Sequence, residues 1–180
     1  FSIKSMMGHA STLLNAGNTT NFVYRLRGPV TQEVIDHVNG RKKGSKLNDV
    51  YSIFKEKGID LSFECMESGT FDHNLVLIDS KLPEIVSEML KLYYLDDIHG
   101  IRDQIRVLEH TNPMNYAGCD VPYYAYKIKK MLTAFALGMV PSKASDGREK
   151  ANGGYIIVRN DGEVLCYNVY NRNEFEDYLL

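Results

Sequence analysis

Lys4 is the first residue in this sequence that could do chemistry, because it lies in an apolar run with the pattern of a strand. The run Phe1-Ser2-Ile3-Lys4-Ser5 leads into a polar stretch that contains glycine. A lysine at a strand end that faces a cleft could orient or deprotonate a water molecule beside a metal ion, with its pKa lowered by its surroundings. A lysine on an edge strand that faces solvent is the structural alternative.

Two further segments carry side chains suited to nucleic acid. Residues 8–21 are dominated by small and hydrogen-bonding types, and residues 137–155 form a basic stretch that contains several glycines. Asn and Thr side chains can contact phosphates and base edges, and Lys and Arg attract phosphates. Turn and capping chemistry is the alternative for the first segment, and an exposed connector is the alternative for the second.

Composition narrows the class of protein. The chain has 180 residues, of which 44% are hydrophobic and 24% charged, as expected for one globular domain. Phosphate-loop, dinucleotide-loop, serine-hydrolase and zinc-protease motifs are absent from the sequence. No apolar run is long enough to cross a bilayer and no secretory leader opens the chain, so the sequence favours a cytoplasmic protein without a membrane partner.

The three cysteines carry no metal-site signature. Cys65, Cys119 and Cys166 are far apart, and no Cys-x-x-Cys pair occurs. A zinc site needs clustered thiolates or imidazoles. We therefore expect three reduced thiols in the core.

Charge is unevenly distributed along the chain, although the formal net charge is only −2. Residues 1–50 hold seven Lys and Arg against three Asp and Glu, and residues 110–150 hold six against three. Residues 51–109 and 151–180 are acidic. A protein that grips DNA needs only one positive face, because phosphate attraction is local. Solvated charged faces are the alternative.

Hydrophobic periodicity and turn residues predict the elements that position these side chains. The pattern predicts strands near 1–6, 22–26, 59–65, 75–78, 155–158 and 164–170. It predicts helices near 32–39, 47–57, 83–95, 98–109, 122–137 and 174–180. Asn160-Asp161-Gly162 predicts a hairpin between the last two strands. The sequence thus indicates a mixed α/β protein with a helical middle.

Taken together, these segments resemble the HpaII-type family of type II restriction endonucleases. The resembling stretches near the start are 1–5, 11–16 (Ser-Thr-Leu-Leu-Asn-Ala) and 20–22 (Thr-Asn-Phe). Those near the end are 136–139 (Ala-Leu-Gly-Met), 152–155 (Asn-Gly-Gly-Tyr), 162–167 (Gly-Glu-Val-Leu-Cys-Tyr), 171–175 (Asn-Arg-Asn-Glu-Phe) and 178–179 (Tyr-Leu). The matches occur in order at both ends of the chain.

The resemblance implies a fold class of α/β type: a restriction-endonuclease-like, PD-(D/E)xK mixed sheet flanked by helices, here incomplete, with a helical middle and a C-terminal β-hairpin. We expect one domain over 1–180, made of a partial nuclease core (1–80), a helical region (81–140) and a basic loop with hairpin (141–180). The chain departs from the family pattern at Ser2, where an acid is usual. Glu33 is the candidate replacement, and the upstream Asp is expected before Phe1.

The implied reaction is Mg²⁺-dependent hydrolysis of double-stranded DNA at a CCGG-type site, within a restriction–modification system. Lys4, Ser2 and Glu33 are the candidate catalytic residues, and the Ile3 carbonyl is a candidate metal ligand. Candidate DNA contacts are Ser11, Thr12, Asn15, Asn21, Lys143, Arg148, Lys150 and Asn152. A homodimer is expected for a palindromic site, with a cognate methyltransferase as system partner. A non-catalytic DNA-binding domain, decayed or split from such an enzyme, is the alternative.

Overall fold

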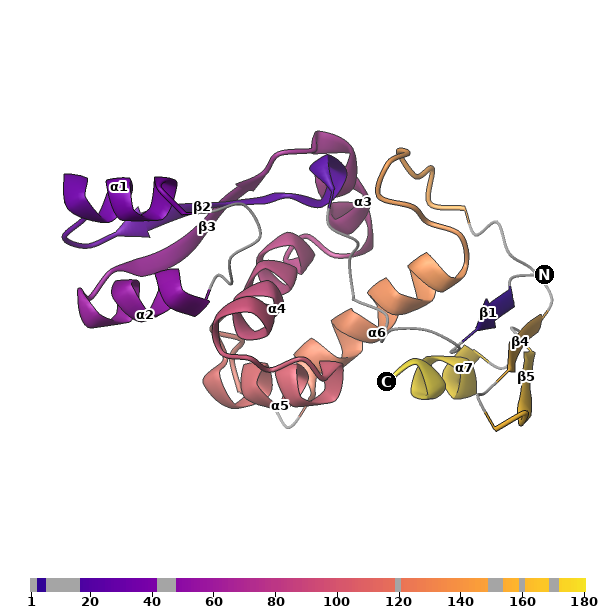
Figure 1. Cartoon of the computed structure of the whole chain (residues 1–180). Coiled ribbons are helices and arrows are strands. Elements are labelled where there is room, and N and C mark those ends of the chain that lie inside the picture. Colours follow the sequence, from indigo (N-terminus) through magenta and orange to yellow (C-terminus); the bar gives the residue numbers. More distant parts are fainter. Residues whose placement is uncertain are drawn as a thin grey trace.

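The computed structural model describes residues 3–5, 17–41, 48–118, 121–148, 154–158, 161–168 and 172–180. Within these residues helices and two small sheets alternate, so the predicted mixed α/β class is confirmed (Figure 1). The elements are β1 (Ile3–Ser5), η1 (Asn18–Thr20), β2 (Phe22–Arg27), α1 (Gln32–Asn39), α2 (Asn48–Glu56), β3 (Asp60–Met66), α3 (Gly69–Ile78), α4 (Leu82–Leu95), α5 (Ile101–Thr111), α6 (Tyr123–Ala136), β4 (Gly154–Val158), β5 (Val164–Asn168) and α7 (Arg172–Leu179).

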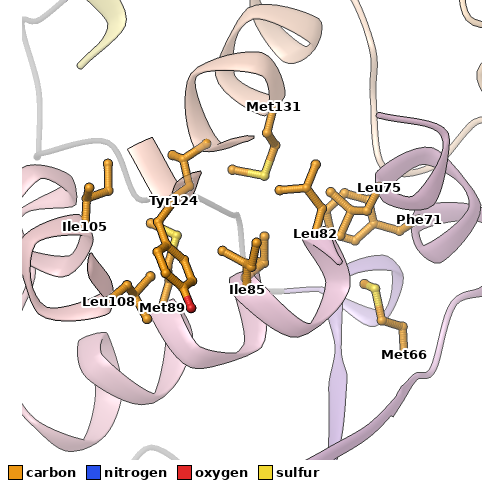
Figure 2. Close-up of a cluster of buried hydrophobic side chains, with 12 residues drawn as sticks. Met66, Phe71, Leu75, Leu82, Ile85, Met89, Ile105, Leu108, Tyr124 and Met131 are labelled. Carbon is orange, nitrogen blue, oxygen red and sulfur yellow. The ribbon is translucent and has the colours of Figure 1, made fainter. Parts of the chain in front are cut away.

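Helices α3 to α6 form the centre of the molecule, which we call the helical body. Their buried side chains form one cluster together with Met66 of β3, and most of its members are completely buried (Figure 2). Its residues are Met66, Phe71, Leu75, Leu82, Ile85, Val86, Met89, Ile105, Leu108, Tyr124, Ile128 and Met131. Full burial of such a side chain contributes about 1.5–3 kcal/mol, so this cluster is the main apolar core among the described residues.

Several predicted boundaries are confirmed because local chemistry sets them. The Oγ1 atom of Thr31 accepts from the backbone N–H of Val34 at 3.4 Å, which caps α1, and the helix stops at Gly40. Pro83 lies in the first turn of α4. β4 and β5 form the predicted antiparallel hairpin, and Gly162 in its turn adopts φ +84°.

β2 and β3 form an antiparallel ribbon that carries α1 and α2 away from the helical body; we call these four elements the outer lobe (Figure 1). A separate cluster of Val34, Val50, Phe54 and Ile59 fills it. Two hydrogen bonds join the ribbon to α4. Tyr24 donates to the carbonyl of Ser87 at 2.8 Å, and Lys91 donates to the carbonyl of Leu61 at 3.1 Å.

Three expectations were wrong. Residues 75–78 belong to helix α3 rather than to a strand, with Phe71 and Leu75 buried one turn apart. A short apolar run has no period that separates the two alternatives. α5 begins at Ile101 and not at Ile98, because Gly100 is its N-cap in an extended conformation.

The third error concerns the thiols. Cys65 and Cys166 are free, as expected, but both are exposed. In β3 the register shifts because Phe63 pairs with Tyr24 while Cys65 pairs with Val23, which leaves Glu64 as a bulge. The bulge turns Cys65 outward and Met66 inward. Cys119 lies outside the described residues.

Strand pairing brings the two ends of the chain together. β1 pairs with β4 in parallel, so the N-terminal strand joins the C-terminal hairpin in a sheet of order β1-β4-β5. β2 and β3 pair only with each other among the described strands. Long-range pairing of this kind leaves no local signal in the sequence.

Candidate functional site

The three-stranded sheet β1-β4-β5 positions Lys4. The structure describes the backbone of β1, in which Ile3 is paired with Ile156, Lys4 with Ile157 and Ser5 with Val158. The two ends of the chain therefore meet in one sheet, although more than 140 residues separate them. This brings the segment around Lys4 beside the hairpin.

Helix α7 joins this sheet to the helical body (Figure 1). Phe175 is 1% exposed and packs with Leu137, which is also 1% exposed. Two ion pairs connect α7 with α6: Lys129 Nζ lies 2.6 Å from Asp177 Oδ1, and Lys130 Nζ lies 2.8 Å from Glu176 Oε1. The sheet is thus attached through a small apolar contact and two charge pairs.

A cavity of about 370 Å³ lies where α3, α6, α7 and the segment 139–148 meet; we call it the junction cavity. Its volume falls within the range of small-molecule sites, about 300–1,000 Å³. The described residues that line it are Leu77, Ile78, Asp79, Tyr126, Lys127, Lys130, Thr133, Ala134, Leu137, Met139, Ser145, Gly147, Arg148 and Glu176. The lining therefore combines apolar side chains with several charges.

Asn74 fixes one wall of this cavity. Its side chain is completely buried, and its Nδ2 donates to the carbonyls of Val140 at 3.0 Å and Lys143 at 2.9 Å. Its Oδ1 accepts from the backbone N–H of Ser145 at 2.7 Å. These three bonds tie a segment without regular secondary structure to α3, so the wall has a defined position.

The charges around the cavity are mostly paired. Lys127 forms a short ion pair with Asp79, and Lys130 pairs with Glu176. In the described part of the chain the Arg148 guanidinium has no acidic partner. Burial raises the pKa of the neighbouring Tyr116 phenol. The positive charge of Lys127 acts in the opposite direction and lowers this pKa, but by less.

The predicted site residues fall into separate places. Lys4 and Ile3 lie on β1, and Lys143 and Arg148 lie in the segment 139–148, where Lys143 is exposed and Arg148 lines the junction cavity. Asn21 precedes β2, and its Nδ2 donates to Glu67 at 2.8 Å. Ser2, Ser11, Thr12, Asn15, Lys150 and Asn152 lie outside the described residues.

Glu33 is not brought to β1. It lies in the first turn of α1, its side chain is 85% exposed, and its nearest cation is Lys57 at 3.8 Å. α1 and β1 lie at opposite ends of Figure 1. The proposed replacement of the missing acid by Glu33 therefore finds no support in this arrangement.

Sequence reasoning missed most of the junction cavity. Lys127, Lys129 and Lys130 all belong to α6, and each forms an ion pair with a carboxylate from another part of the chain. The role of Asn74 was not predicted, because a strand was expected at residues 75–78. A polar side chain next to an apolar run was the available signal, and it indicates a buried hydrogen-bonding role.

Metal and membrane features can be stated only for the residues that the structure describes. Among them, no three His, Cys, Asp or Glu side chains cluster in a way that could hold a metal ion. No helix in the same residues combines the length and apolar character required to cross a bilayer.

Comparisons with known proteins place the chain in a family. Residues 1–180 match the family described as HpaII restriction endonuclease. The chain is 43% identical over 182 residues to the type II restriction enzyme HpaII of Haemophilus parainfluenzae, with 99% of this chain and 49% of that relative covered. It thus spans about half the length of this relative. No solved structure matches. The chain therefore belongs to the HpaII restriction endonuclease family.

Proposed function

We propose that this chain is part of a type II restriction endonuclease that hydrolyses double-stranded DNA at a CCGG-type site in a Mg²⁺-dependent reaction. The observation that carries the proposal is the parallel pairing of β1 with β4. Family-like segments from the two ends of the sequence become neighbours in one sheet through this pairing. Such a sheet beside a helical body is compatible with a PD-(D/E)xK core.

Lys4 has the central role in this proposal. An ammonium group at this position would orient the attacking water, and a lowered pKa would populate the neutral amine, which could accept a proton from that water. Ser2 and the Ile3 carbonyl are its neighbours on the same segment. Lys143 and Arg148, on the segment 139–148, would contact backbone phosphates and set the register on DNA. Asn21 and the predicted contacts outside the described residues complete the proposed surface.

The described residues do not offer a carboxylate set that fits Mg²⁺, which prefers oxygen ligands in octahedral geometry. We therefore assign the metal to no described residue. The proposal includes a homodimer, since a two-fold protein matches a palindromic site. It also includes a cognate methyltransferase in the same system and action in the cytoplasm, where the DNA is.

A DNA-binding module without cleavage is the second candidate. Ser2 favours it, because a hydroxyl is a poor substitute for a carboxylate as a divalent-metal ligand.

Digestion of paired plasmids separates the two candidates. One plasmid carries CCGG sites and the other has each site mutated, and both are incubated with the chain and Mg²⁺ or with EDTA. The endonuclease proposal predicts discrete fragments only from the first plasmid with Mg²⁺. Salt-sensitive binding of a CCGG duplex without fragments would favour the binding module. If the chain neither binds nor cleaves the CCGG duplex, both candidates are contradicted.

A further inference from the structure

The junction cavity has features that the proposed cleavage site on β1 does not use, and it shares Arg148 with the proposed DNA contacts. It contains a cation without a described acidic partner, a buried hydroxyl without a hydrogen-bond partner and an exposed aromatic ring. Each comes from a different position on its wall. Together they describe the chemistry of a ligand.

The lining charges favour an anion. Lys127, Lys130 and Arg148 face two carboxylates, Asp79 and Glu176, among the described lining residues. Both lysines are paired with these carboxylates, so the surplus positive charge belongs to Arg148. A guanidinium has a fork of donors that matches phosphate oxygens.

Thr133 supplies the second observation. Thr133 is 3% exposed, and its buried Oγ1 has no hydrogen-bond partner among the residues that the structure describes. A buried hydroxyl that is left unpaired destabilises the folded state, and such groups are rare in folded proteins. Because Thr133 lines the cavity, rotation of its side chain to another rotamer would turn this hydroxyl toward a polar atom of a bound molecule.

Tyr126 supplies the third. Its side chain is 59% exposed although it lines the cavity, and Lys130 Nζ lies 5.3 Å from its ring centroid. Tyr126, Lys130 and Thr133 follow helical spacing, so they share one face of α6. An exposed tyrosine ring at the edge of a basic cavity is a surface on which a nucleobase can stack.

We propose that the junction cavity binds a single nucleotide, with the phosphate at Arg148, the base against Tyr126 and a polar atom at Thr133. The nucleotide can come from two sources: a free mononucleotide, or a DNA strand from which one base has left the stack. The proposal concerns binding, and it stands whether or not the chain cleaves DNA.

Mononucleotide binding to the intact chain is the first test, measured by calorimetry with dAMP, dCMP and inorganic phosphate. We expect the mononucleotides to bind about tenfold more tightly than inorganic phosphate, because stacking adds to the phosphate contact. Tyr126→Ala should remove this difference, and Arg148→Gln should weaken both kinds of ligand. Tyr94→Ala and Arg106→Gln, on α4 and α5, are the matched controls and should bind like the unaltered chain.

Thr133→Val separates a ligand-binding role from a structural one. The substitution keeps the shape and removes the unpaired hydroxyl, so the thermal midpoint without ligand should stay the same or rise. Nucleotide affinity should nevertheless fall roughly fivefold. A lower midpoint with unchanged affinity would contradict the role of Thr133 and, with it, the proposal.

DNA containing 2-aminopurine distinguishes the two sources. A rise in fluorescence on binding, lost in Tyr126→Ala, would show that DNA supplies the nucleotide. Binding of mononucleotides without a fluorescence change would assign the cavity to a free nucleotide. The proposal is overturned if mononucleotides bind no more tightly than phosphate and the fluorescence is unchanged, or if Tyr94→Ala has the same effect as Tyr126→Ala.

Discussion

The helical body and the three-stranded sheet are stabilised in different ways. The helical body has one cluster of twelve buried residues, most of them without measurable exposure. The sheet has apolar side chains that remain partly exposed, with Ile156 at 38%, Val158 at 37% and Val164 at 55%. Its attachment to the body depends on Phe175, Leu137 and the ion pairs of α7 with α6.

The region that stabilises the fold is therefore not the region to which we assign the proposed chemistry. The apolar burial that dominates folding lies in the body, whereas Lys4 lies on the sheet. Regions with few buried apolar contacts open locally at lower free energy than a core does. We therefore expect the sheet to loosen before the helical body unfolds.

Phe71→Ala should produce the largest effect on stability. Phe71 is completely buried between β2, α3 and α6, with ring contacts to Phe22 at 6.5 Å and Phe135 at 6.0 Å. Truncation of such a ring costs about 3–5 kcal/mol. Denaturant unfolding, followed by the circular dichroism of the helices, should show this loss in the free energy of unfolding. A loss below about 1 kcal/mol would contradict the assignment of the body as the main core.

Phe175→Ala should weaken the sheet attachment more than the body. The ring contacts Leu137 in a two-residue buried cluster, so its loss should free α7. Hydrogen exchange should become faster in α7 and β5 while α4 remains protected. Equal acceleration in α4 would show that the sheet and the helical body unfold as one unit, which would contradict the expected difference in their stability.

The Lys130–Glu176 pair should contribute a smaller, charge-dependent part of the same attachment. Glu176 is 7% exposed, whereas the Lys130 side chain is 38% exposed, so the pair is partly screened. Glu176→Gln should cost roughly 1–2 kcal/mol, between the values for exposed and buried pairs. The reversed pair Lys130→Glu with Glu176→Lys should recover part of this loss. No recovery would indicate packing rather than charge.

The smallest of these predicted effects is at the junction between the outer lobe and the helical body, which alkaline pH should weaken. Burial raises the pKa of Tyr24 well above its usual value. Its phenol therefore ionises more easily in the unfolded chain, and stability falls as pH rises above about 10. Tyr24→Phe should cost about 1 kcal/mol at pH 8, through the lost bond to Ser87, and less at higher pH. A constant difference across this range would contradict the effect.

Elements with local signals were predictable from the sequence. Thr31 and Gly40 bound α1, and Asp161-Gly162 marks the β4–β5 turn. The pairing of β1 with β4 was not predictable, because it joins distant segments. The junction cavity was also inaccessible, since Asn74, Thr133 and Arg148 meet only after α3, α6 and the segment 139–148 have packed. The family resemblance made Lys4 a catalytic candidate, which periodicity alone could not separate from a surface lysine; this role stays a prediction.

The central claim is that Lys4 acts in DNA cleavage from a sheet that contributes little to folding. Cleavage of a CCGG plasmid with Mg²⁺ by the unaltered chain, by Lys4→Ala and by the control Lys55→Ala tests it most directly. We predict that Lys4→Ala loses cleavage by about 10²–10⁴-fold, with unchanged DNA affinity and thermal midpoint, while Lys55→Ala cuts normally. Cleavage by Lys4→Ala at the unaltered rate, or no cleavage by the unaltered chain, would contradict the account.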